Sequence, residues 1–325
     1  MMKCSCPDGD WKTISLQSAM KTRLVPGCGF SGGLCIVSTV LLLIAGFALA
    51  GSTAASADEC IQYLDQGRMN WYSGKMTAES DLFVQRPADQ PDSGRAVLVR
   101  QARMEARKRL WQSLLQLRID RGLFVRDVLS RDQELAQAIL GKIHHSQLQT
   151  LSLGSGEVRV QALVKLRGEL SGRLIPRSIW FEQVRPQDWE AAPDAPQAPD
   201  NAADPSPSAV YTGLIVDLRG FDFQPSLIIR IFDDFGQELY GPTLVDPQYA
   251  IANGICVYTT SLQSALSSER AGDNPFLVRA GGIRPDANHG IRFVPQSAEA
   301  FLKASQLEAI YQECRVVVVT REGRP

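Results

Sequence analysis

Histidine is scarce in this chain, and the common catalytic motifs are missing. The sequence holds three histidines, and the adjacent pair His144 and His145 would point about 100° apart on a helix, which does not suit a shared metal ion. It has no Gly-rich phosphate loop, no G-x-S-x-G turn and no H-E-x-x-H pair. We therefore expect a non-enzymatic protein with no cofactor and no metal.

The chain also lacks an excess of positive charge. Beyond residue 57, 30 Lys and Arg residues stand against 33 Asp and Glu residues, which gives a net charge of about −3. Surfaces that bind nucleic acid are strongly basic. We expect no nucleic-acid partner.

Few cysteines remain once the N-terminal segment is set aside. Cys60, Cys256 and Cys314 are the only ones beyond residue 57. An oxidising compartment would favour a disulfide between Cys256 and Cys314, since both fall in the same part of the chain. Small buried side chains are the equal alternative.

Residues 1–57 are predicted to be an N-terminal extension with an export signal. Lys21 and Arg23 precede an uncharged apolar run from Leu34 to Ala50, and Ala55-Ser56-Ala57 supplies a small-residue exit. We expect cleavage after Ala57, or less favourably after Ala50, and a location in the periplasm or at the outer membrane. The alternative is an uncleaved inner-membrane anchor, which would be the protein's only attachment to a membrane.

A proline-rich acidic segment divides the rest of the chain. Residues 186–208 hold six prolines and five acids, with Trp189 as their one large apolar side chain. Such a composition is typical of an extended, cleavable linker. It separates a first domain at 58–185 from a second at 209–325.

The first domain is predicted to be a small α+β domain with helices on one face of a sheet. Residues 67–84 are extended, 95–117 and 131–144 are helical, 119–129 form a strand, and 147–153 with 157–166 form a hairpin. On the first helix, an apolar stripe recurs at helical spacing. It consists of Val99, Ala102, Ala106, Leu110, Leu114 and Leu117.

A basic face lies opposite this stripe. Its candidate interaction residues are Arg100, Arg103, Arg107 and Lys108. A solvated helix face is one interpretation. The other is contact with an anionic polymer of the cell envelope, such as lipopolysaccharide phosphates, or with an acidic protein surface.

The second domain is also predicted to be α+β. Expected strands lie at 210–218, 226–232, 237–240, 255–260, 276–280 and 315–320, with helices at 262–268 and 297–304. The β-branched run before Thr320 is typical of a central strand covered on both faces. A ligand pocket in this domain would lie near Asp217, Arg219 and Tyr240.

Two segments resemble known envelope proteins. Ala96 to Leu110, followed by the hairpin strand Val158 to Val164, is similar to the envelope domain of flagellar basal-disc proteins and related small outer-membrane lipoproteins. The N-terminal domain of flagellar assembly protein T has a closely related architecture. The lipobox of those lipoproteins is absent here, so the resemblance carries no lipid anchor with it.

The second domain resembles uncharacterised exported proteins. These share T-G-L-I-V-D-x-R-G, P-x-L, D-x-x-G-x-E-x-Y-G and C-R-V-V, found here at 212–220, 225–227, 233–241 and 314–317. Together the resemblances imply an envelope assembly or structural protein, flagellum-related, that associates with itself or with envelope proteins. The alternative function is an envelope ligand-binding protein or hydrolase with its site in the second domain.

Overall fold

The structure is a computed structural model that describes residues 59–83, 93–120, 122–152, 157–181, 210–283, 290–304 and 307–321. The expected export signal and the linker at 186–208 lie outside these ranges. None of the helices within them is long and apolar enough to cross a membrane. The described residues belong to one compact unit, which spans Ala54–Pro325.

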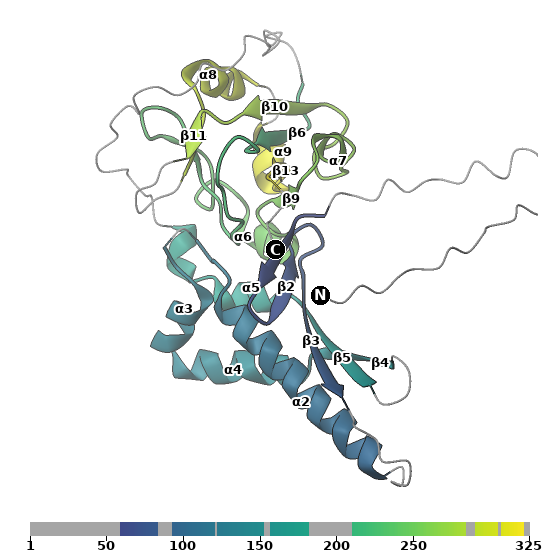
Figure 1. The fold of residues 1–325 in the computed structure, drawn as a ribbon. Coiled ribbons are helices and arrows are strands. Elements are labelled where there is room, and N and C mark those ends of the chain that lie inside the picture. Colours follow the sequence, from purple (N-terminus) through teal and green to yellow (C-terminus); the bar gives the residue numbers. More distant parts are fainter. Residues whose placement is uncertain are drawn as a thin grey trace, which may run out of the picture. The chain divides into compact units, whose positions relative to one another are not determined.

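The described residues of the first part of this unit, 59–181, form an antiparallel sheet, four α-helices and a short 3₁₀ helix. Figure 1 shows their arrangement. The strand order is β1-β2-β3-β5-β4, so the terminal strands are β1 and β4. The elements are β1 (Ile61–Leu64), β2 (Gly67–Asn70), β3 (Lys75–Phe83), α2 (Ser93–Leu115), α3 (Val125–Arg131), α4 (Gln133–His144), β4 (Gln147–Ser152), β5 (Glu157–Lys165), α5 (Glu169–Leu174) and the 3₁₀ helix η1 (Arg177–Trp180).

Helix α2 covers one face of this sheet through the predicted stripe. From Ala102 to Leu117, the five stripe positions after Val99 are completely buried, while Val99 itself is half-buried. The helix packs on β3 and β5, whose inward residues include Met76 and Val160. The two alanines of the stripe lack long side chains, so the helix backbone can approach the sheet closely.

The strand predicted at 119–129 is wrong. Residues 118 and 124 form only an isolated bridge, and α3 begins at Val125. The Asp127 carboxylate accepts a hydrogen bond from the Phe124 N–H at 2.9 Å, and this stabilises the start of the helix. Local capping therefore outweighs the apolar pattern of this segment. The next helix, α4, starts after Asp132, whose side chain accepts from the Leu135 N–H.

The second part contains a four-stranded parallel sheet in the order β10-β6-β13-β9. A second, mixed sheet has the order β11-β12-β7-β8. The elements are β6 (Gly213–Asp217), β7 (Ile231–Phe232), β8 (Glu238–Tyr240), α6 (Pro247–Asn253), β9 (Val257–Thr259), α7 (Leu262–Leu266), β10 (Pro275–Arg279), β11 (Gly282–Ile283), β12 (Ile291–Arg292), α8 (Pro295–Lys303), α9 (Leu307–Gln312) and β13 (Val316–Val319).

The β-branched run forms β13, an interior strand of the parallel sheet, as predicted. Val317 and Val319 pack toward α7, while Val316 and Val318 join the larger core on the other face. All four valines are completely buried. The fold class is thus mixed α+β, with helices and sheets in both parts.

The predicted strand at 226–232 is much shorter in the structure, and only Ile231–Phe232 forms β7. The preceding residues bond elsewhere: the N–H of Leu227 donates to the Arg118 carbonyl at 3.0 Å, and the N–H of Ile228 donates to the Ile119 carbonyl at 2.8 Å. Ile228 and Ile229 are both buried, so no alternation of faces is present. This segment contacts the first part of the unit instead of extending a sheet.

Candidate functional site

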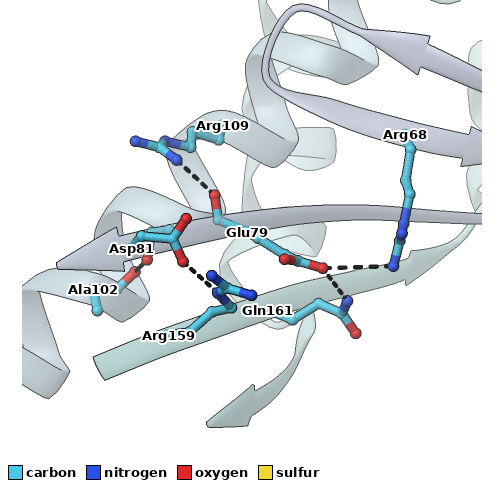
Figure 2. Close-up of polar contacts among 8 residues, drawn as sticks. Arg68, Glu79, Asp81, Ala102, Arg109, Arg159 and Gln161 are labelled. Atoms are coloured by element: carbon cyan, nitrogen blue, oxygen red, sulfur yellow. Dashed lines mark hydrogen bonds and ion pairs between the residues drawn. The ribbon is translucent and has the colours of Figure 1, made fainter. Parts of the chain in front are cut away.

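The basic face of α2 is exposed at three of its four predicted positions. Arg100, Arg103 and Lys108 are exposed, whereas Arg107 is half-buried. Their neighbour Arg109 turns toward the sheet, where its Nη1 donates to the Glu79 carbonyl at 2.7 Å (Figure 2). The face therefore offers positive charge to solvent.

The sheet face that α2 does not cover is polar and internally paired (Figure 2). Glu79 accepts a hydrogen bond from Gln161 at 2.7 Å and lies 3.5 Å from the Arg68 guanidinium. Asp81 pairs with Arg159, its direct neighbour in the β3–β5 register. A subunit that packed on this face would bury paired charges and gain little hydrophobic stabilisation. This favours the strand edges over the open face as a place of assembly.

Strand β4 presents the longest edge among the sheets of the described residues. Its six residues, Gln147–Ser152, pair with β5 on one side without any register shift. Within the described ranges, no strand pairs with its other side. Its sequence QLQTLS carries no charge, proline or glycine. Charge, proline and a β-bulge, three features that commonly prevent a second strand from adding, are therefore absent from β4.

The other described sheet edges are short or protected. Strand β10 begins with Pro275 and ends with Arg279, the two residue types that commonly block edge pairing. Strands β8, β9 and β11 have three, three and two residues. Strand β1 has four residues and follows Glu59, which bridges to Thr259 in the second part. Strand β4 is thus the edge best suited to pairing with another chain.

Two of the three predicted pocket residues lie together. Arg219 holds the Asp217 carboxylate through Nε at 3.0 Å and Nη2 at 2.8 Å, and its backbone N–H donates to the same group at 3.0 Å. Burial acts to raise the pKa of Asp217, but these hydrogen bonds and the charges of Arg219 and Arg279 bring it below its usual value. Asp217 is therefore a fixed carboxylate at the end of β6.

Tyr240, the third predicted pocket residue, is not part of this group. It is completely buried in β8, and its hydroxyl donates to the Ile255 carbonyl at 2.6 Å. Burial raises its pKa well above the usual value. Tyr240 therefore lies in a different sheet from Asp217, and its hydroxyl serves a backbone hydrogen bond in the core.

The described cysteines are free and buried. No disulfide joins Cys256 to Cys314, so the structure matches the alternative of small buried side chains. Burial raises the pKa of Cys256 to about 12 and that of Cys314 to about 11. Because a thiolate is the reactive form, neither thiol is activated as a nucleophile. Nor do three His, Cys, Asp or Glu side chains gather as metal ligands within the described ranges.

The sequence predicted the β4 strand but not its position at the end of the sheet. The hairpin of β4 and β5 follows from alternating residues, whereas the place of β4 at the end of the sheet depends on β5 pairing with β3. The lack of charge and proline in QLQTLS was the available signal.

Comparison with known proteins adds one partial match. Residues 213–322 match the family model described as the second domain of Treponema pallidum Tp0624. The match begins at the first residue of β6 and continues past β13, so it spans the whole parallel sheet. No curated protein matches the chain.

Proposed function

We propose that this protein is a non-enzymatic component of the cell envelope, periplasmic or outer-membrane-associated and related to flagellar assembly, that self-associates through β4. The observation that carries the proposal is the unprotected six-residue edge Gln147–Ser152. An edge strand offers unpaired backbone N–H and C=O groups, and a second strand can pair with them. The apolar run from Leu34 to Ala50 and the Ala55-Ser56-Ala57 exit support the envelope location.

A second copy is the proposed occupant of the β4 edge. In an antiparallel pair around a twofold axis, each strand meets its own sequence in reverse. Since QLQTLS has no charge, such a pair places no like charges opposite each other. The two sheets would then continue into one across the dimer, with α2 of each copy still covering its own sheet.

The exposed basic face supports a role for anionic envelope polymers as additional partners. Arg100, Arg103 and Lys108 point to solvent on α2, away from the sheet. Contacts of this type are electrostatic and weaken as salt screens them. They would leave the β4 edge free for pairing.

Sedimentation velocity of residues 54–325 tests the self-association. We expect a concentration-dependent dimer, and we expect the double substitution Gln147→Lys with Gln149→Lys to abolish it. Both glutamines are exposed, and lysine on an edge strand opposes pairing because two copies would bring like charges together.

The matched control is Gln263→Lys with Gln296→Lys, two exposed helical positions in the second part. It adds the same charge and should leave the dimer intact. A strict monomer at all concentrations, or equal loss of dimer in both double variants, would refute pairing through β4.

A further inference from the structure

Three strand ends of the parallel sheet bring charged residues together. Strands β10, β6 and β13 are adjacent and parallel, so their carboxyl ends lie at the same edge of the sheet. In the register, Asp217 of β6 lies between Arg279 of β10 and Val319 of β13. In open parallel sheets, ligands bind just outside the carboxyl ends of the strands.

Two of the three arginines at this edge are held in place. Arg219 is tied to Asp217 through two of its nitrogens. Arg321, two residues beyond β13, donates from Nε to the Arg219 carbonyl at 2.7 Å and from Nη2 to the Gly220 carbonyl at 3.1 Å. Because these two side chains are already held in place, a ligand can bind them with a smaller loss of side-chain conformational entropy.

The third arginine is available for a ligand. Arg279 is exposed, and within the described ranges its guanidinium makes no hydrogen bond or ion pair. It lies over the turn after β6, since a Cβ on Gly220 would be 3.5 Å from its Nη2. All three guanidinium groups therefore surround the segment from Asp217 to Gly220.

The donors and charges of this cluster exceed what the protein itself uses. A guanidinium has five N–H donors, and the bonds of Arg219 and Arg321 occupy only part of them. The charges of Arg219 and Arg279 act on Asp217, whereas Arg321 binds the Arg219 and Gly220 carbonyls and no carboxylate, so these four residues together carry a positive surplus. A group with two negative charges and several acceptor oxygens complements this arrangement better than a single carboxylate does.

We propose that Arg219, Arg279 and Arg321 form a binding site for a phosphate group, either free phosphate or the phosphomonoester of a larger envelope molecule. Phosphate carries about −1.5 to −2 charges at pH 7, and its oxygens accept paired hydrogen bonds from arginine. Asp217 acts as the positioning residue, because it holds Arg219 toward the ligand. The site lies within the segment that matches the Tp0624 family model and is independent of the β4 edge.

Titration of residues 54–325 with inorganic phosphate, followed by the NMR signals of the arginine Nε–H groups, tests this site. We expect saturable shifts of the arginine signals at the sheet edge, and about tenfold weaker binding for Arg279→Gln, the effect of losing one charge-assisted hydrogen bond. Arg321→Gln should weaken binding at least as much, since it also releases the 219–220 turn.

Control variants and ligands make the outcome decisive. Arg131→Gln removes an exposed arginine at the end of α3 and should leave the affinity unchanged. Acetate should bind more weakly than phosphate. Glucose 6-phosphate that binds more tightly than phosphate supports a phosphomonoester ligand, and equal affinity supports free phosphate.

Absence of saturable binding, or full affinity in Arg279→Gln, would overturn the proposal. Because Arg279 makes no bond within the described fold, that variant should fold normally.

Discussion

Arg230 and Glu238 form the most buried ion pair among the described residues. Their side chains are only 4% and 11% exposed, and the Arg230 Nη1 lies 3.0 Å from the Glu238 carboxylate. Thr243 donates a further hydrogen bond to Glu238 at 2.9 Å, and Arg230 donates to the Ile179 carbonyl at 3.3 Å. Burial raises the pKa of Glu238 in spite of the Arg230 charge and these bonds. Each charge therefore depends on the other for its place in the core.

Removing one member of this pair should lower the free energy of unfolding more than removing both members. Arg230→Met leaves the Glu238 carboxylate buried without its counter-charge, and we expect the free energy of unfolding to fall by about 3–5 kcal/mol. The double variant Arg230→Met with Glu238→Met leaves no unpaired charge in the core, so its free energy of unfolding should fall by less. Urea unfolding of residues 54–325 compares them. Equal losses in the two variants would contradict an unpaired charge as the cause.

The pH dependence of Arg230→Met provides a second readout with a definite sign. A carboxyl whose folded-state pKa is raised stabilises the fold below its unfolded pKa, near 4.5, and loses that contribution as pH rises through the folded value. Loss of Arg230 should raise the pKa of Glu238 further. The loss of unfolding free energy in Arg230→Met, relative to the native chain, should thus be small near pH 4 and larger at pH 7.

At the scale of single elements, local patterns predicted the fold well where one face of an element is buried. The stripe of α2 and the valine run of β13 each specify their own burial. The strand prediction at 119–129 failed because the apolar residues of this segment suit both a strand and a short helix. The hydrogen bond from the Phe124 N–H to Asp127 favours the helix. The strand prediction at 226–232 failed because this segment donates its backbone hydrogen bonds to the carbonyls of Arg118 and Ile119. Those residues lie more than 100 positions earlier in the chain.

Helix α2 should be stabilised by its stripe and not by its charges. Leu110 and Leu114 are completely buried, so Leu→Ala at either position should lower the free energy of unfolding by about 2–5 kcal/mol. Arg103 is exposed, and Arg103→Ala should change it by less than about 0.5 kcal/mol. Thermal and urea unfolding of residues 54–325 measure both. Similar losses for leucine and arginine variants would show that the helix buries a different face.

At the scale of the whole unit, the candidate sites depend on which strands are neighbours. Asp217 and Arg219 were predictable as a pair because they are two residues apart at the end of a strand. Arg279 and Arg321 were not, because only the order β10-β6-β13 brings them beside Asp217. Tyr240 was predicted to lie near Asp217, and the structure places the two residues in different sheets.

Contacts between the residues before and after the 186–208 segment are extensive. The buried cluster that contains the α2 stripe also contains residues of β6, β10 and β13. Trp71 packs edge-on against the Tyr258 ring, with centroids 5.6 Å apart. The Gly168 N–H donates to the Ile251 carbonyl at 2.8 Å. These contacts combine apolar burial with directional hydrogen bonds, as in the interior of a single core.

We therefore expect the two halves to stay together after the chain is cut between them. A protease site placed between residues 194 and 200 should be cleaved, because this composition favours an extended chain. The fragments should still elute as one species in size-exclusion chromatography, since the shared core does not depend on the connection. Trp71→Ala removes a nearly buried ring at this contact, so the cut variant should separate at lower protein concentration than the cut native chain. Fragments of the native sequence that elute separately and remain folded would instead establish two independent domains.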